Sequence, residues 1–223
     1  DSLSAFVFKT IVDPFVGKLN LFKVMSGQLS TGATIYNVNK EKAEKVSNIY
    51  FMRGKKQIST DKVVAGDIAA VAKLQHTVTG DSLCDQGRQL ELREIKFPEP
   101  SISLAIEAEK EGEEDKVFGG LNRLTEEDPT FTVEKNTETN QMIISGVGEM
   151  HLEIIAKRLE NKFAAKAVFK DPKVAYRETI RKSIQAEGRH KKQSGGHGQF
   201  GHVWIEFEPL TDTEQEFEFV DKI

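Results

Sequence analysis

The chain has 223 residues, of which 38% are hydrophobic and 30% are charged, and its formal net charge is −4. These values are typical of a folded globular protein and exclude wholesale disorder; because the chain is acidic, any contact with nucleic acid must be local. One cysteine, Cys84, excludes an internal disulfide framework and a multi-cysteine zinc site, and no apolar run reaches the ~18 residues that a membrane helix needs.

Residues 1–96 are predicted to form a closed or nearly closed β-barrel. Segments 5–12 and 19–25 are rich in aromatic and β-branched residues, which favour strands. Turn signals, such as Asp13-Pro14 and Thr79-Gly80-Asp81, recur at short intervals, and no convincing helical window lies between them. Cys84 belongs to this region, and we expect it to be a small buried hydrophobic residue rather than a reactive thiol.

Two prolines, Pro98 and Pro100, predict a stiff, extended connector after the barrel. Residues 99–171 then follow the order strand, helix, strand, strand, helix, strand, which is typical of a ferredoxin-like α+β domain. Gly146-Val147-Gly148 is expected to be a tight turn that lets a strand and a helix pack closely, and the acidic run 126–128 to end the first helix in solvent. The helices are predicted from apolar residues at helical spacing: Val117, Leu121 and Leu124, then Leu152, Ile155, Ala156, Leu159 and Phe163.

Residues 173–223 predict an incomplete β-rich domain. Strand-like segments lie at 175–180, 203–207 and 216–220, and no helical pattern accompanies them. A segment of this size is too short for an independent core, and an incomplete sheet leaves unpaired edges. The chain also begins at Asp1 without an initiator methionine, and a strand pattern follows almost at once. We therefore expect a piece of a longer protein.

The sequence makes no case for catalysis or for a metal site. Gly196 to Gly201 matches G-x-G-x-x-G, but a strand follows it where the dinucleotide motif needs a helix. Neither a P-loop nor a G-x-S-x-G or H-E-x-x-H motif occurs. His190, His197 and His202 lie close together, but their irregular spacing favours RNA contact or solvation over a metal. We assign no catalytic, metal-binding or nucleotide-binding residue.

A basic, glycine-rich tract, residues 189–201, is the strongest candidate for binding. Lysine and arginine neutralise phosphates, glycine lets the backbone approach an anion, and amides and hydroxyls bond phosphate, ribose or bases. Composition alone leaves two interpretations open, a nucleic-acid contact or a solvated hairpin loop without a partner. Phe200 is expected either to stack on a base or to pack inward. The candidate contact residues are Arg189, His190, Lys191, Lys192, Gln193, Ser194, Gly195, Gly196, His197, Gly198 and Gln199.

Several segments together resemble bacterial elongation factor G in the order of its domains. Segments 13–19 (DPFVGKL), 65–68 (AGDI) and 79–84 (TGDSLC) are similar to its second domain. Segments 97–100 (FPEP), 126–131 (EEDPTF) and 145–152 (SGVGEMHL) are similar to its third. Segments 176–180 (YRETI) and 193–201 (QSGGHGQFG) are similar to the start of its fourth. The resemblance covers nearly the whole chain, which divides at 1–96, 99–171 and 173–223.

The family is a multidomain translational GTPase that promotes tRNA and mRNA translocation in the cytoplasm. The resemblance implies that GTP and Mg²⁺ bind in a domain before Asp1, so no cofactor and no enzymatic activity are expected for this chain itself. It implies contacts with the ribosome, through 16S and 23S rRNA and small-subunit protein S12, and with tRNA and mRNA at the decoding centre. The barrel would pack on the parent's GTPase domain, and the ferredoxin-like domain would lie near S12.

Residues 193–201 would form the first tip loop of the fourth domain. The family more often has arginine where this chain has His197, so the charge there depends on pH. The second tip loop and the fifth domain would lie beyond Ile223, and translocation by this segment alone is not expected. Two alternatives stay open: an elongation factor G-like paralogue that acts in ribosome recycling, and a stand-alone RNA- or ribosome-binding protein.

Overall fold

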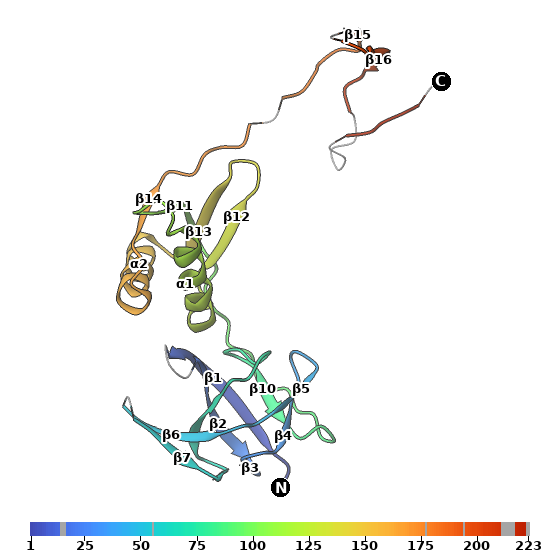
Figure 1. Ribbon diagram of the computed structural model, residues 1–223. Coiled ribbons are helices and arrows are strands. Elements are labelled where there is room, and N and C mark those ends of the chain that lie inside the picture. Colours follow the sequence, from blue (N-terminus) through green and yellow to red (C-terminus); the bar gives the residue numbers. More distant parts are fainter. Residues whose placement is uncertain (14–16, 55, 177, 194, 211–216, 222–223) are drawn as a thin grey trace. The chain divides into compact units, whose positions relative to one another are not determined.

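The computed structural model describes residues 1–13, 17–54, 56–176, 178–193, 195–210 and 217–221. It divides into two compact units, Asp1–Val174 and Ala175–Ile223, each of which is described by itself (Figure 1). The first unit contains a β-barrel followed by an α+β domain. Neither helix in the described part of the chain has the length and apolar character that crossing a membrane requires.

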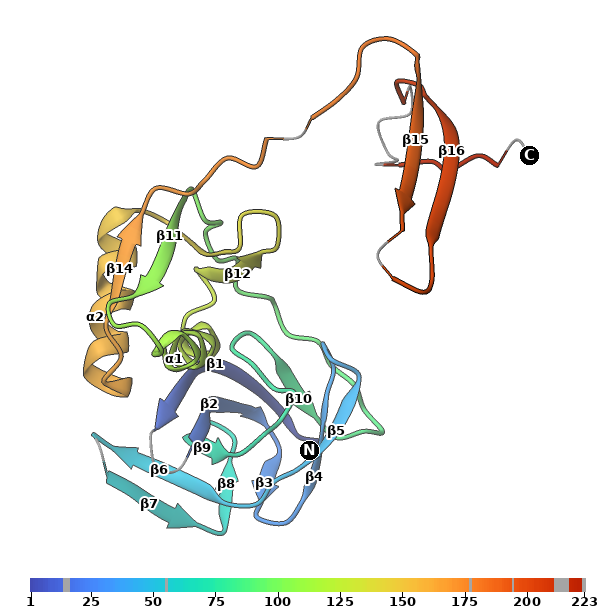
Figure 2. The ribbon, with the colours of Figure 1, turned by 45° about the horizontal axis from the view of Figure 1, so that its top comes forward.

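The barrel is an antiparallel sheet of eight strands in the order β5-β4-β10-β1-β2-β9-β6-β7, completed by the short pair β3-β8 (Figure 2). Its core gathers alternate residues from strands far apart in sequence, among them Val7, Phe22, Ile35 and Leu83. The strands are β1 (Ser4–Asp13), β2 (Gly17–Ser26), β3 (Gln28–Ser30), β4 (Thr34–Asn37), β5 (Lys42–Lys45), β6 (Ile49–Arg53), β7 (Lys56–Thr60), β8 (Lys62–Val64), β9 (Ile68–Ala72) and β10 (Ser82–Cys84).

The two ends of this sheet are joined around the segment before β4. The Gly32 N–H donates to the Val46 carbonyl at 2.8 Å, and the Thr31 N–H donates to the Asp61 carbonyl at 2.9 Å. The predicted barrel is thus confirmed, and Cys84 is buried in it, as expected. Pro14, which contributed a turn signal, lies outside the described residues.

A polar cluster fastens the loop between β9 and β10 to the barrel. Glu44 on β5 accepts hydrogen bonds from the Gln75 N–H, from the His76 N–H at 3.1 Å, and from the Thr77 hydroxyl. The amide of Asn37 donates to the Thr77 hydroxyl at 3.1 Å. Glu44 is only 7% exposed, and its carboxylate holds the start of the β9–β10 loop against β5 through these three hydrogen bonds.

The α+β domain has the predicted ferredoxin-like topology. Its antiparallel sheet has the order β12-β13-β11-β14, so the last strand pairs with the first, and both helices pack on it through one core that includes Ile106, Leu121, Ile144 and Leu152. Its elements are β11 (Ile102–Ala108), α1 (Glu114–Glu127), β12 (Thr132–Asn136), β13 (Gln141–Gly146), α2 (Glu149–Phe163) and β14 (Ala167–Lys170).

The last position of β13, just before the turn into α2, requires a residue without a side chain. A Cβ at Gly146 would lie 2.6 Å from Cδ2 of Leu152 and 3.0 Å from Nδ1 of His151. Leu152 is fully buried, so it has little room to move aside. The prediction that this glycine segment permits close packing between strand and helix is confirmed.

Neighbouring glycines in α1 offer a matched test of helix packing. Gly119 has no atom within 4 Å of where a Cβ would be, whereas a Cβ at Gly120 would overlap Cδ1 of Leu159 on α2. Alanine is more favourable than glycine in a helix by ~1 kcal/mol, but overpacking costs about 1–3 kcal/mol. We expect Gly119→Ala to raise the free energy of unfolding by about 0.5–1 kcal/mol, and Gly120→Ala to lower it by about 1–2 kcal/mol. Urea denaturation followed by circular dichroism measures both; equal stabilisation would show that α1 and α2 separate easily.

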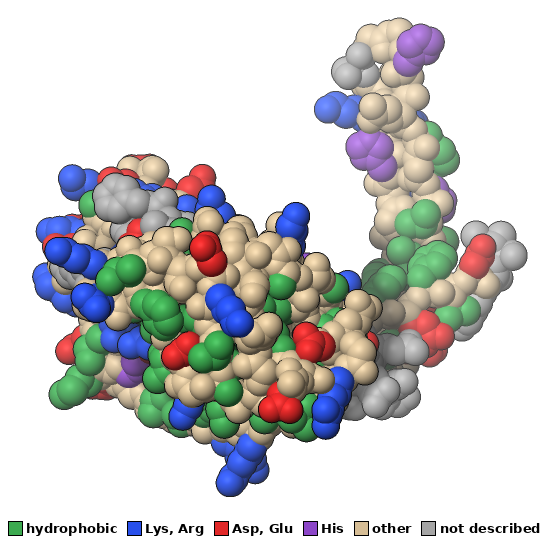
Figure 3. All heavy atoms as spheres, turned by 90° about the horizontal axis from the view of Figure 1, so that it is seen from below, with side chains coloured by type: hydrophobic (Ala, Val, Ile, Leu, Met, Phe, Trp, Pro, Cys, Tyr) green, Lys and Arg blue, Asp and Glu red, His purple; other side chains and the backbone are tan. Residues whose placement is uncertain are grey.

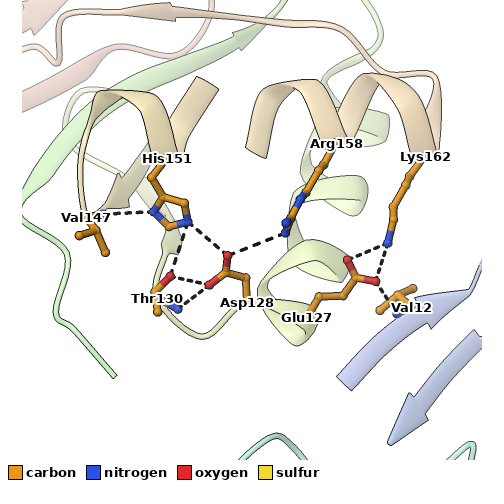
Figure 4. Close-up of polar contacts among 8 residues, drawn as sticks. All are labelled: Val12, Glu127, Asp128, Thr130, Val147, His151, Arg158 and Lys162. Carbon is orange, nitrogen blue, oxygen red and sulfur yellow. Dashed lines mark hydrogen bonds and ion pairs between the residues drawn. The ribbon is translucent and has the colours of Figure 1, made fainter. Parts of the chain in front are cut away.

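The acidic run at the end of α1 joins the α+β domain to the barrel, so the prediction that it ends the helix in solvent is wrong for Glu127. The Glu127 carboxylate accepts a hydrogen bond from the Val12 N–H of β1 at 2.6 Å and pairs with Lys162 Nζ of α2 at 2.6 and 2.8 Å (Figure 4). The Glu127 side chain is 9% exposed. Glu126, its neighbour, is exposed as predicted.

Asp128, the residue after α1, is likewise bonded rather than free in solvent. It accepts from the backbone N–H of Thr130 at 3.1 Å and from the Thr130 hydroxyl, and it lies 3.2 Å from His151 Nε2 (Figure 4). The Val147 N–H donates to Nδ1 of the same ring at 3.2 Å, so a neutral His151 carries its proton on Nε2 and donates to Asp128. Burial alone would raise the pKa of Asp128, but the hydrogen bonds from Thr130 and His151 outweigh it and lower that pKa.

Candidate nucleic-acid interface

The described residues of the second unit contain one β-hairpin, formed by β15 (Ile184–Lys192) and β16 (Gln199–Phe207). The strands pair without a break from Ile184↔Phe207 to Lys192↔Gln199. The basic tract is therefore not a loop throughout. Its cations lie on β15, and residues 199–201 belong to β16, so the connection between the strands is shorter than the tip loop 193–201 that the resemblance implies. Ser194, one of the candidate contact residues, lies outside the described residues.

Two other strands expected in this unit do not appear among its described residues. The described residues of 175–180 and of 216–220 are neither strand nor helix; Arg177 and Glu216 lie outside the described residues. The expectation failed because strand propensity acts only through pairing with a neighbour, and these segments have no paired strand among the described residues. None of the described side chains of this unit is buried, as expected for a segment too short to build its own core.

The connection between the strands depends on glycine geometry. Gly195 has a φ of +73° and Gly196 a φ of +28°, values that L side chains rarely adopt. His197 and Gly198 complete the connection and are exposed. The loop therefore offers backbone with few side chains in the way, next to a basic strand, which is the arrangement that lets backbone N–H groups approach a phosphate.

The histidines at 190, 197 and 202 do not form a metal-binding group. His190 and His202 belong to adjacent cross-strand pairs, His190↔Gly201 and Arg189↔His202, and adjacent pairs point to opposite faces of a ladder. His190 Nε2 lies 3.1 Å from Gln199 Oε1, and His202 Nε2 lies 2.7 Å from Glu187 Oε1. Across the described residues, no group of three or more His, Cys, Asp and Glu side chains could hold a metal ion.

The cations of β15 are divided between the two faces. Arg189 and Lys191 share one face, and Lys192 lies on the other, together with His190. All of these side chains are exposed, and histidine and basic side chains are visible at the surface of this unit in Figure 3. The candidate contact residues that the structure describes thus form one continuous exposed end of the hairpin.

Phe200 does not pack inward: it is 68% exposed, and Trp204 on the same strand is 66% exposed. Trp204 is not among the contact residues predicted from the sequence. The alternation of residues 203–207 indicates a strand in which every second side chain faces the same way. It does not tell which of the two faces carries the cations of β15, because that depends on the register with the paired strand.

Comparisons with known families match almost the whole chain in three consecutive parts. Residues 2–86 match the model described as elongation factor G domain 2, residues 97–171 the model of elongation factor G domain III, and residues 172–223 the model of elongation factor G domain IV. The last match contains the hairpin.

Relatives of known name show the same relationship over the full chain. All 223 residues align at 47% identity with elongation factor G of Thermotoga maritima and with that of Thermotoga neapolitana. The chain spans 32% of the length of each. A crystal structure of a protein from Thermus thermophilus superposes with a TM-score of 0.75 at 31% identity, over 95% of this chain and 32% of that one.

Proposed function

Because the chain belongs to the elongation factor G family, of which it spans the second and third domains and part of the fourth, we propose that it is the ribosome-binding part of a translational GTPase. The whole protein promotes movement of tRNA and mRNA through the ribosome, in the cytoplasm. GTP and Mg²⁺ bind to a separate domain, and this segment neither binds nor hydrolyses GTP. The three matched domains, in their order, support this proposal.

The hairpin is the part of the segment that we propose to contact RNA at the decoding centre. The observation that carries this proposal is the exposed glycine loop at the end of a strand with four consecutive cationic or titratable side chains, Arg189 to Lys192. Positive side chains attract the phosphate backbone, and positive-φ glycines leave room for its close approach. The barrel would contact 16S rRNA, and the α+β domain would lie near protein S12.

The cations of the hairpin end are expected to set the salt dependence of binding. If Lys191 and Lys192 each contact one phosphate, the double variant Lys191→Ala/Lys192→Ala should reduce the slope of log K against log salt concentration by about two, roughly one per contact. Affinity should fall by a similar factor for different RNA sequences, since phosphate contacts carry no sequence information. Binding of the fluorescently labelled chain to small ribosomal subunits, measured over a salt series, gives the slope.

A matched variant separates hairpin contacts from bulk charge. Arg181→Ala/Lys182→Ala removes the same charge from the same unit but outside the hairpin. It should leave the slope near that of the unaltered chain. A slope that stays unchanged in the Lys191/Lys192 variant would place these lysines in solvent and contradict the proposed contact.

A further inference from the structure

One face of the hairpin carries a row of aromatic rings beside the cations, which we call the aromatic stripe: Phe200, His202 and Trp204. The pairs Lys191↔Phe200, Arg189↔His202 and Glu187↔Trp204 alternate with pairs that point the other way, so the three rings share a face with Arg189 and Lys191. The opposite face is apolar from Ile184 and Phe207 up to Val203, the character of a sheet face that a folded domain buries. Both faces are exposed in this unit, but the outer rings of the aromatic stripe are the more exposed: Phe200 is 68% and Trp204 66% exposed, against 43% for Ile205 and 44% for Phe207.

The rings of the aromatic stripe are spaced and tilted so that they do not cover one another. The centroids of Phe200 and His202 are 6.5 Å apart with planes inclined by 63°, and those of His202 and Trp204 are 6.5 Å apart with planes inclined by 57°. The hydrogen bond from His202 to Glu187, at 2.7 Å, holds the middle ring between the outer two. The outer rings, Phe200 and Trp204, therefore keep their faces open to solvent.

Exposed aromatic rings in a row beside cations are the arrangement on which proteins bind single-stranded nucleic acid. Each base offers a planar face for stacking, and the cations attract the backbone that joins the bases. Here Lys191 lies across from Phe200 and Arg189 across from His202, whereas Glu187 lies across from Trp204. The charge therefore favours phosphates toward the glycine loop and disfavours them at the other end of the stripe, where only the ring of Trp204 is attractive to a nucleotide.

From this geometry we infer that the aromatic stripe is a stacking platform for single-stranded RNA, with bases on Phe200 and Trp204 and phosphates beside Lys191 and Arg189. The inference rests on the proposed function and deepens it, because it names unpaired bases, in addition to phosphates, as what the hairpin recognises. It also predicts that base-paired RNA binds less well, since its bases are stacked on each other and their faces are unavailable.

Trp204 reports on this platform directly, because it is the single tryptophan of the chain. Titrating the 223-residue chain with a short adenine-rich RNA should quench tryptophan fluorescence saturably. The same RNA paired with its complement, and a polyphosphate of matched charge, should leave the fluorescence nearly unchanged. Equal quenching by duplex or polyphosphate, or no binding of the single strand, would overturn the stacking platform.

Affinity measurements with labelled RNA test the rings separately from the fold of the hairpin. Trp204→Leu keeps an apolar side chain but removes the ring, and should weaken binding about 5- to 100-fold. Trp204→Tyr should retain most of the affinity, and Phe200→Leu should weaken binding while Trp204 still reports a folded, quenchable site. If both leucine variants bind RNA as the unaltered chain does, stacking is refuted.

The outcomes distinguish this inference from the proposed function. A reduced salt slope in the Lys191/Lys192 variant, with unchanged affinity in the leucine variants, would keep the phosphate contact and reject stacking. Normal RNA affinity combined with lost binding to small ribosomal subunits in Trp204→Leu would assign the aromatic stripe to a ribosomal protein instead, and would also reject it. Failure of the unaltered chain to bind small subunits would contradict the proposed function itself.

Discussion

Glu44→Ala is expected to lower the free energy of unfolding of the barrel by about 2–4 kcal/mol, because the buried Thr77 hydroxyl and two partly buried backbone N–H groups lose their acceptor. The carboxylate accepts from the N–H groups of Gln75 and His76 and from the Thr77 hydroxyl. Alanine provides no replacement acceptor. A buried donor left unpaired costs ~1–3 kcal/mol, and the two N–H groups contribute less than this because they belong to exposed residues, which water can reach. Amide hydrogen exchange should show faster exchange at residues 75 and 76, and urea denaturation should show the lower stability.

The matched control for this substitution lies next along the same strand. Lys45 is exposed on β5, and Lys45→Ala should change the free energy of unfolding by no more than about 0.5 kcal/mol. Glu44→Gln keeps one carbonyl oxygen as an acceptor and should fall between the two. A destabilisation by Glu44→Ala as small as that of Lys45→Ala would mean that water replaces the carboxylate at this position.

The second large effect concerns the junction between the barrel and the α+β domain. Glu127→Ala removes the acceptor of the Val12 N–H and the partner of Lys162 together, and should cost about 2–4 kcal/mol. The destabilisation should stay below the largest values found when one partner of a buried ion pair is removed, because the Lys162 side chain is 33% exposed and water can solvate its charge. The expected signature is faster amide exchange at Val12 and separate unfolding transitions of the two domains.

Glu126→Ala is the control for that experiment, since it removes the same charge from the same helix at an exposed position. It should leave both exchange at Val12 and the unfolding profile almost unchanged. One cooperative transition in Glu127→Ala, at the stability of the unaltered chain, would show that the junction is held by apolar contacts and that the carboxylate contributes nothing measurable.

Local periodicity was sufficient to predict both domains of the first unit. The helices of the α+β domain were identified from residues such as Leu121 and Leu152, whose spacing matches a helix and whose side chains are indeed buried. The barrel was predicted from β-rich segments between turn signals, and the glycine turn at Gly146 from the need for close packing. In each case the individual strand, helix or turn is specified by residues within a few positions of one another, although the strands that pair in the barrel are far apart in sequence.

What could not be predicted depends on partners that are distant in sequence. Glu127 follows the pattern of a solvated helix end, and nothing near it indicates that Val12 and Lys162 surround it. Residues 189–192 are basic and are poor strand formers, yet their pairing with residues 199–202 makes them the end of β15. Conversely, 175–180 has strand-like residues but no partner strand among the described residues. Pairing overrode local preference in both directions.

The register of β15 and β16 also restricts how this protein can change over generations. Substitution at one position alters one side chain, but insertion or deletion of a single residue within either strand reverses the faces of every residue beyond it. Lys191 and Arg189 would then lie opposite different neighbours, and the apolar residues around Val203 would turn toward solvent. Insertions and deletions are therefore expected to accumulate in the connection between the strands, whereas β15 and β16 themselves are expected to change only by substitution.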